Sequence, residues 1–385
     1  MILPVLLAVS IAGDWRAISR AESAQSFPTS AIWTIEVSAL PVAPPVASTT
    51  RLFVALQSGV SARRLDTGAE VWQAALEVVG PLAASEDRLV VPVKGELRVL
   101  DASTGAVAWT DRAGPLTAPP LVHAEYLLVA SAEQVICYRV ADGVRVWSRE
   151  IGTVEQRPAV DGTLVYIPAV DGRVIALELT TGEPAWEREV GIKPTEPLVY
   201  GGRVFVGAAA KRFCSLKAPS GEVDWCFRVG AAVVGRPVAD DAHVYYVAFD
   251  NLLRAHDRKN GAFLWKKDLR YRPSAGPLLV GASVAAPGRV PRVQVFDART
   301  GSPTIQLTLA SSLATLPLLI EPSGEMPARI AAVTGGLPNV WTVTLAGPAP
   351  ADAPTISTAP FTELPGQAIP IGWPPASPGR LPPGA

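Results

Sequence analysis

The chain is poor in the residues on which most metal and nucleophilic chemistry depends. Its 385 residues include only 3 histidines, 3 cysteines and 2 methionines, and only 18% of them are charged. The sequence contains no GxSxG element, no Walker loop, no CxxC pair and no HExxH spacing. These absences exclude the common motifs of hydrolases, nucleotide-binding proteins and zinc sites. The formal net charge of −1 predicts neither nucleic acid nor an anionic membrane surface as a partner.

The few cysteines and histidines give no site by their spacing. Three cysteines are too few for a disulfide framework. Cys214 and Cys226 flank the Ser220-Gly221 turn, so they are either buried thiols or partners across a hairpin, and Cys137 has no evident partner. We expect structural or surface roles for the three histidines, which are His123, His243 and His256.

Long apolar runs are also missing. Residues 1–13 are apolar but too short to span a bilayer, so no transmembrane span is expected. The run resembles the core of a secretory signal, with Ser10-Ile11-Ala12 as a candidate cleavage site, although a basic segment before it is lacking. We therefore treat residues 1–30 as a candidate signal segment and linker, and expect a periplasmic or exported protein.

The C-terminal segment 347–385 is rich in proline and alanine and has almost no charge. Such a composition predicts a disordered tail. Within it, Phe361–Trp373 carries several large hydrophobic residues, so this part is either a linker or a segment that docks on the protein or on a partner.

What the chain does have is a repeat. Seven glycines are each followed four residues later by a large hydrophobic residue, at intervals of 37, 38, 39, 39, 40 and 40 residues. The pairs are Gly68 and Trp72, Gly105 and Trp109, Gly143 and Trp147, Gly182 and Trp186, Gly221 and Trp225, Gly261 and Trp265, and Gly301 and Ile305. A fixed period of this length is the signature of a repeat architecture.

Prolines recur in the same register and extend the count to eight. They follow each tryptophan or Ile305 by nine to twelve residues, and Trp33 precedes Pro44 by 11. The eighth unit lacks its own glycine–tryptophan element. The segment Ala31–Val37, which carries Trp33, would supply that missing strand and close a ring covering residues 31–346.

Each unit predicts four short antiparallel strands. In residues 158–190, runs rich in Val, Ile and Leu are separated by Asp161-Gly162, Asp171-Gly172 and Thr181-Gly182, which are turn signals. We find no 3.6-residue apolar stripe in the repeat region. The prediction is an all-β, eight-bladed β-propeller of four-stranded antiparallel blades, closed by an N-terminal strand. Each tryptophan should wedge against the next blade, so blade seven, with Ile305, should have the weaker joint.

The element before each tryptophan has its own pattern, as in LRVLDASTGAVAW (97–109) and VQVFDARTG (293–301). It resembles the repeat of pyrroloquinoline-quinone (PQQ) type β-propellers, the quinoprotein alcohol dehydrogenase-like superfamily. Glu178 and Lys217 depart from the aspartate of that pattern. Asp101, Asp257 and Asp297 keep it in three different blades, and because of this periodic recurrence we expect them to fix turns rather than to catalyse.

The resemblance implies two different functions. Members of the superfamily that are dehydrogenases bind PQQ with calcium, and many have a vicinal Cys-Cys pair, which this chain lacks. The compact, non-catalytic, BamB-like members present a rigid surface to protein partners in the cell envelope. We favour the second function, without a cofactor. A small PQQ-dependent oxidoreductase and a ligand-sensing propeller are the alternatives.

The loops between each tryptophan and the next proline should all emerge on one face. Three of them carry a charge directly before the proline, at Arg157, Glu196 and Arg236, and KKDLRYR (266–272) adds a basic loop. We expect Arg157, Glu196, Arg236, Arg270, Tyr271 and Arg272 to ring the mouth of the central channel. The hypothesis is that they contact a protein partner or an anionic ligand, and the alternative is a solvated loop face.

Overall fold

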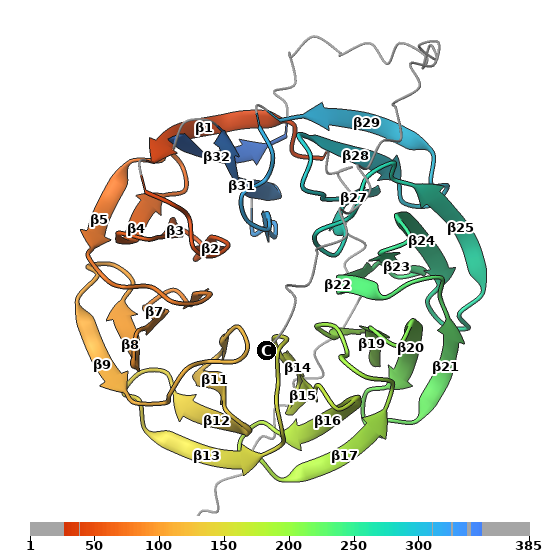
Figure 1. The fold of residues 1–385 in the computed structure, drawn as a ribbon, viewed down its shortest axis with the longest axis horizontal. Helices are drawn as coiled ribbons and strands as arrows, with labels where there is room; N and C mark the ends of the chain where they lie inside the picture. Colours follow the sequence, from red (N-terminus) through yellow and green to blue (C-terminus); the bar gives the residue numbers. More distant parts are fainter. Residues whose placement is uncertain (1–26, 38, 310, 325, 337–339, 349–385) are drawn as a thin grey trace, which may run out of the picture. The chain divides into compact units, whose positions relative to one another are not determined.

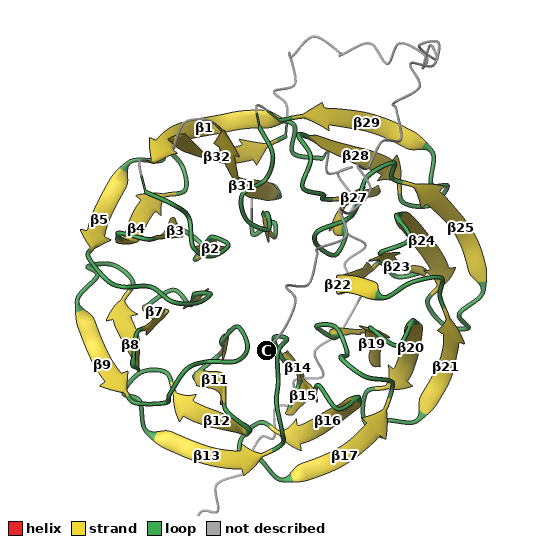
Figure 2. Cartoon of the chain, viewed as in Figure 1, coloured by secondary structure: helices red, strands yellow, loops and turns green. Residues whose placement is uncertain are grey.

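The computed structural model describes residues 27–37, 39–309, 311–324, 326–336 and 340–348, and all regular structure in them is β. The strands form eight four-stranded antiparallel sheets, which are arranged as blades around a central axis (Figures 1 and 2). The predicted fold is therefore confirmed. The candidate signal segment and nearly all of the proline-rich tail lie outside the described residues.

Each blade runs from an innermost strand at the axis to an outer strand at the rim (Figure 1). The innermost strands are β2 (Val46–Ala47), β6 (Ala83–Ala84), β10 (Leu121–His123), β14 (Ala159–Asp161), β18 (Leu198–Tyr200), β22 (Val233–Ala239), β26 (Leu278–Val280) and β30 (Leu318–Ile320). The second strands are β3 (Arg51–Leu56), β7 (Arg88–Val93), β11 (Tyr126–Ser131), β15 (Leu164–Pro168), β19 (Arg203–Ala208), β23 (His243–Ala248), β27 (Ser283–Ala286) and β31 (Arg329–Gly336).

The two outer positions of each blade complete the pattern. The third strands are β4 (Gly59–Arg64), β8 (Glu96–Asp101), β12 (Gln134–Arg139), β16 (Arg173–Glu178), β20 (Arg212–Lys217), β24 (Leu252–Asp257), β28 (Arg292–Asp297) and β32 (Val340–Gly347). The rim strands are β5 (Glu70–Ala74), β9 (Val107–Asp111), β13 (Arg145–Glu150), β17 (Pro184–Glu189), β21 (Val223–Arg228), β25 (Phe263–Asp268), β29 (Pro303–Thr308) and β1 (Ser30–Val37).

The ring is closed by strands from opposite ends of the repeat region. The eighth sheet has the order β1-β32-β31-β30, in which β1 pairs antiparallel with β32 and Trp33 lies opposite Leu345. Thr29 N–H adds a hydrogen bond to the Gly347 carbonyl oxygen, 2.9 Å away. The N-terminal closure that the sequence predicts is therefore present.

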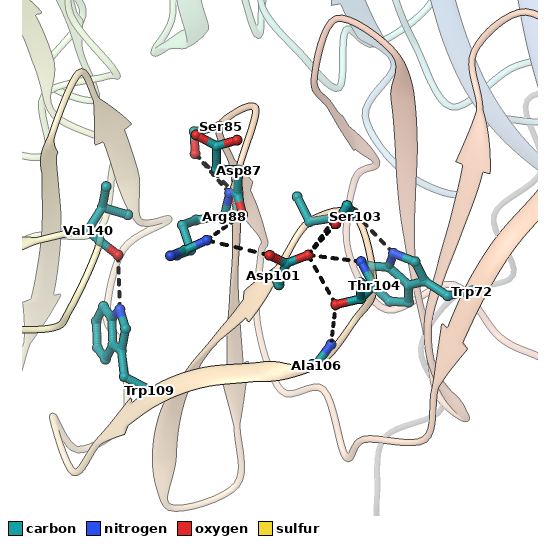
Figure 3. Close-up of polar contacts among 11 residues, drawn as sticks. Trp72, Ser85, Asp87, Arg88, Asp101, Ser103, Thr104, Ala106, Trp109 and Val140 are labelled. Atoms are coloured by element: carbon teal, nitrogen blue, oxygen red, sulfur yellow. Dashed lines mark hydrogen bonds and ion pairs between the residues drawn. The ribbon is translucent and has the colours of Figure 1, made fainter.

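The blades are joined by a tryptophan ring that packs on the glycine of the next blade. A Cβ atom added to any of the seven repeat glycines would lie only 2.4–2.8 Å from that ring. These glycines also have positive φ values of 66–76°, which other residues rarely adopt. Six of the seven rings donate an indole hydrogen bond to a backbone carbonyl of the neighbouring blade, as Trp109 does to Val140 at 2.9 Å (Figure 3).

An aspartate fixes the turn after the third strand in blades two, six and seven, as the sequence predicts. The Asp101 carboxylate accepts hydrogen bonds from the backbone N–H groups of Ser103 (2.9 Å) and Thr104 (3.0 Å) (Figure 3). Hydrogen bonds from the Ser103 and Thr104 side chains also lower the pKa of Asp101 to about 2. Asp257 and Asp297 accept the corresponding backbone bonds in their own blades. These aspartates therefore build turns.

The joint between blades seven and eight is built differently. Ile305 remains 38% exposed at the position where other blades carry tryptophan. Phe27, which precedes β1, is instead only 3% exposed and packs in one cluster with Val295 of blade seven and Ile330 of blade eight. The N-terminal segment thus supplies both the closing strand and an aromatic side chain for the joint that lacks the repeat tryptophan.

The joint between blades five and six also departs from the pattern. The indole nitrogen of Trp225 is buried and has no hydrogen-bond partner among the described residues. Phe227, two residues after Trp225 on β21, stacks on His256 of blade six, with 4.5 Å between the ring centroids. At the equivalent positions in blades three and four, Arg149 and Arg188 donate to the glycine carbonyl of the next blade. Aromatic stacking therefore replaces hydrogen bonding at this joint.

The sequence leaves open whether Cys214 and Cys226 are buried thiols or partners across a hairpin, and the structure shows the second arrangement. Cys214 and Cys226 lie directly opposite each other on β20 and β21, with Cα atoms 4.1 Å apart, and they form a disulfide. Cys137 is a buried free thiol whose pKa is raised to about 12 by burial. Its high pKa makes Cys137 an unreactive thiol at neutral pH.

Candidate binding surface

The two faces of the ring differ in the segments that form them. Because consecutive strands are antiparallel, one face carries the connections from rim strand to next innermost strand and the turns from second to third strand. We call it the loop face. The opposite face carries the remaining turns, including the aspartate turns, and we call it the turn face.

Large apolar side chains are exposed on the loop face in at least five different blades or connections. Ile192 is 60% exposed and Phe249 is 40% exposed. The others of this kind are Leu40, Val42, Val79 and Leu316. Other exposed apolar side chains, such as Val107 and Phe263, lie on rim strands, so it is the combination of Ile192 and Phe249 with a cavity that marks this part of the loop face.

A cavity of about 230 Å³ opens on this face between blades four, five and six. Its walls are mainly apolar and include Pro168, Val170, Pro194, Val233, Val234 and Phe249. The same cavity is lined by Lys193, which forms a 3.2 Å ion pair with Glu155 of the preceding connection. An apolar side chain of a partner would fit this cavity and be flanked by charge at its edge.

Three of the residues singled out from the sequence directly follow lining residues of this cavity in the chain, although they do not line it themselves. Its lining residues Gln156, Thr195 and Gly235 are the immediate sequence neighbours of Arg157, Glu196 and Arg236. The Arg236 Nε lies 4.0 Å from the Glu196 Oε1, and Arg157 also stabilises the Glu196 carboxylate electrostatically. The structure therefore brings these three side chains from three blades to one place beside the central axis.

The hydrogen-bond donors of this cluster are only partly used. Burial raises the pKa of Glu196, and the charges of Arg157 and Arg236 oppose that shift. The Nε of Arg157 is buried and makes no hydrogen bond within the described part of the chain. The Glu321 carboxylate also interacts with Arg236, so two carboxylates face the two guanidinium groups. The Arg157 Nε is the donor that remains for an acidic group on a ligand or partner.

Arg270, Tyr271 and Arg272 are neighbours in the sequence, but their side chains have different environments in the structure. The Tyr271 hydroxyl donates to the Ala286 carbonyl oxygen at 2.6 Å and accepts from Gln294 N–H at 3.3 Å, so this side chain fixes its own loop. Arg272 is exposed and its guanidinium lies 4.1 Å from the centre of the Phe249 ring. Arg270 is exposed and has a positive φ of 55°. Arg272 therefore joins the cavity edge through Phe249, whereas Tyr271 does not face a partner.

Sequence reasoning missed the apolar part of this surface. Ile192 lies in the connection before Pro197, and Phe249 ends a run of strand residues, so each looks like core in the sequence. Only the register of the turns, which shows that both positions lie beyond a strand end, could have marked them as exposed.

The chain matches a family model of an outer membrane assembly factor and is similar in fold to solved structures that include an alcohol dehydrogenase. A family model described as the outer membrane protein assembly factor BamB matches residues 32–188 and 187–315, which together cover 284 of the 385 residues. None of the curated proteins compared with the chain matches it.

Solved structures share the architecture at low identity. BamB from Moraxella catarrhalis has a TM-score of 0.66 and 23% identity, over 81% of this chain and 97% of that chain. Quinohemoprotein alcohol dehydrogenase ADHIIG from Pseudomonas putida HK5 has a TM-score of 0.63 and 15% identity, over 87% and 78%. Sqt1 from Saccharomyces cerevisiae has a TM-score of 0.70 and 12% identity, over 84% and 100%. At such identities these likenesses show the fold alone.

The described residues hold no cluster of acidic, histidine or cysteine side chains at which a metal ion of a dehydrogenase-type site could be placed. Beside the axis, Glu196 and Glu321 come from different blades and both interact with Arg236. Calcium prefers several oxygen ligands in one cage, so we derive no reaction through such a group.

Proposed function

Because the chain belongs to the family of the outer membrane protein assembly factor BamB, we propose that it is a non-enzymatic scaffold of the cell envelope. In this role it holds a protein partner on its loop face. The expected export signal at residues 1–13 agrees with an envelope location, and the described residues include no helix with the length and apolar character for crossing a membrane.

The observation that carries the proposal is the 230 Å³ apolar cavity on the loop face, together with the Arg157, Glu196 and Arg236 cluster, whose members each directly follow a lining residue in the chain. Protein interfaces combine a desolvated apolar centre with a polar rim, and an anchor residue in a pocket provides much of the binding energy. The cavity would accept the anchor, and Ile192 and Phe249 would extend the apolar contact. The arginines would pair with acidic groups of the partner at the rim.

The test is site-specific photocrosslinking in the native envelope. A photoreactive amino acid at position 192 or 249 should crosslink to one discrete partner. The same group at Val107, which is 53% exposed but on the rim strand β9, should not. Ile192→Asp and the double charge reversal R157E/R236E should each abolish the crosslinked product from position 249. Equal crosslinking from position 107, or no change in either variant, would contradict the proposal.

A calorimetric titration of the purified protein with PQQ and calcium separates the scaffold from the oxidoreductase alternative. We expect no heat of binding and no dye-linked oxidation activity. Tight, calcium-dependent binding would overturn the non-enzymatic role. Fractionation of cells that express the full chain tests the location, since recovery in the cytoplasmic fraction alone would contradict an envelope function.

A further inference from the structure

Four blades begin their second strand with an arginine, and two of these arginines differ from the others. Arg88 of β7 pairs with Asp101 at 3.7 Å, and Arg203 of β19 pairs with Asp224 at 2.7 Å. Arg51 of β3 and Arg329 of β31 occupy the same strand position, but neither has a carboxylate partner within the described ranges. Two of four equivalent guanidinium groups are therefore uncompensated.

The strand register makes this difference clear. Arg88 lies opposite Asp101 across β7 and β8 (Figure 3). At the same place in blade one, Arg51 lies opposite Arg64. Arg203 likewise lies opposite a cation, Lys217, but it is compensated by Asp224. Arg64 is compensated by Asp66, which leaves Arg51 as the arginine of its strand pair without a carboxylate in the described part of the chain.

These groups surround a groove on the turn face between blades eight and one. Its volume is about 630 Å³, and its lining includes Thr50, Arg51, Arg64, Met326 and Arg329. Arg329 Nη1 donates to the Leu65 carbonyl oxygen at 3.3 Å, whereas its Nε is buried without a partner among the described residues. The Thr50 hydroxyl accepts from Arg51 Nη1 at 3.3 Å, so its own proton is free to be donated.

The groove also contains two carboxylates, but both are already engaged. Asp66 is bound by Arg64, and this hydrogen bond lowers the pKa of Asp66 to about 2. Glu70 forms a 2.8 Å ion pair with Arg63. The acidic side chains among the described residues of the groove are thus neutralised by arginines other than Arg51 and Arg329, and the remaining charge of these described residues is positive.

We propose that this groove is a binding site for a phosphate-type oxyanion, held by Arg51, Arg329 and the Thr50 hydroxyl. Guanidinium groups present paired N–H donors that match the oxygens of phosphate. The bound group would bridge blades eight and one beside the strands that close the ring, β1 and β32. Free phosphate and the headgroup of an anionic phospholipid share this chemistry. The site lies on the face opposite the proposed partner surface, so failure of one proposal leaves the other intact.

The test uses the full chain in phosphate-free buffer with two probes. Inorganic phosphate is titrated by calorimetry, and vesicles with and without phosphatidylglycerol in phosphatidylcholine are used for co-sedimentation. The R51Q/R329Q variant should weaken binding by about a hundredfold, since the loss of one charge-assisted bond weakens it about tenfold. Arg88→Gln, at the equivalent but carboxylate-paired position, should leave binding unchanged. Equal thermal melting of both variants shows that folding is retained.

Each outcome is informative. Phosphate binding that R51Q/R329Q removes supports the site with a soluble ligand, and vesicle binding alone, lost in the same variant, supports it with a lipid headgroup. No binding of either probe, or binding that the variant retains, overturns the proposal. Glu325, the acidic residue nearest to Arg329 in the sequence, lies outside the described residues. Phosphate binding that appears only in Glu325→Gln would show that the chain's own carboxylate fills the site, and would also overturn the proposal.

Discussion

The joint between blades seven and eight gives the most direct test of how this ring is held closed. Phe27 is 3% exposed and packs between residues of both blades, where the repeat tryptophan is replaced by the partly exposed Ile305. Phe27→Ala removes a buried aromatic ring from a joint with no other aromatic side chain in its cluster. We expect the free energy of unfolding to fall by about 3–5 kcal/mol, the usual loss for such a truncation.

The assay is urea unfolding of the full chain followed by tryptophan fluorescence, with limited proteolysis under native conditions. Because Phe27 precedes β1, loss of its packing should also loosen the closing strand. The first proteolytic cuts are therefore expected near residues 27–37. Phe249→Ala is the matched control, since the same ring is 40% exposed there and its removal should change stability by no more than about 1 kcal/mol.

The reasoning would be refuted if Phe27→Ala lost less than about 1 kcal/mol. It would also fail if both phenylalanine variants lost the same amount. Either result would mean that β1 is held by its pairing with β32 alone, and that the N-terminal aromatic side chain does not stabilise the joint.

Three further predictions concern single joints. Trp147 donates an indole hydrogen bond of 2.7 Å and Trp225 donates none, so Trp147→Phe should lose about 1–3 kcal/mol more than Trp225→Phe in urea unfolding. Burial lowers the pKa of His256 in the folded state. Below about pH 6.5, the ordinary pKa of histidine, the unfolded chain therefore binds more protons than the folded chain. The unfolding free energy of the native chain should therefore fall below that pH more steeply than that of His256→Phe, and parallel pH profiles would contradict this. Gly105→Ala would place a Cβ atom 2.7 Å from the Trp72 ring at a φ of +75°, so its melting temperature should drop by several degrees, corresponding to about 1–3 kcal/mol, whereas an unchanged melting temperature would show that the joint tolerates the shift.

The repeat positions were predictable because each is determined within its own blade. A glycine at positive φ, an aspartate that caps the turn and a tryptophan four residues later leave a periodic mark that one sequence suffices to detect. Trp33, outside the seven regular copies, could be assigned because its distance to Pro44 matches the others. The closing strand could be predicted by counting. The eighth blade has only three consecutive strands at the C-terminal end of the repeat region, so its fourth strand had to come from another part of the chain.

Phe27 could not be predicted, because it belongs to no repeat and its sequence neighbours carry no turn or strand signal. The joint between blades five and six was equally hidden. This joint depends on the stacking of Phe227 in blade five on His256 in blade six. The two residues are 29 positions apart in the sequence and come into contact only in the folded ring. The disulfide required the register of β20 and β21, which the hairpin signal alone left open.

The candidate binding surface was predictable in part, and the reason is general for propellers. Charges directly before the repeat proline occupy one register position where the chain reaches the central axis, so Arg157, Glu196 and Arg236 could be placed together from register alone. Arg157 and Glu196 precede β14 and β18, and Arg236 lies within β22. Register does not specify how a loop side chain packs. The Tyr271 hydroxyl is hydrogen-bonded within the protein, whereas the Ile192 side chain is exposed, and register alone could not predict this difference. The same limit applies to the turn face, where Arg51 and Arg88 share one strand position. Arg88 lies opposite Asp101 and Arg51 opposite Arg64, so the charge partner of each arginine depends on residues that its own strand position does not specify.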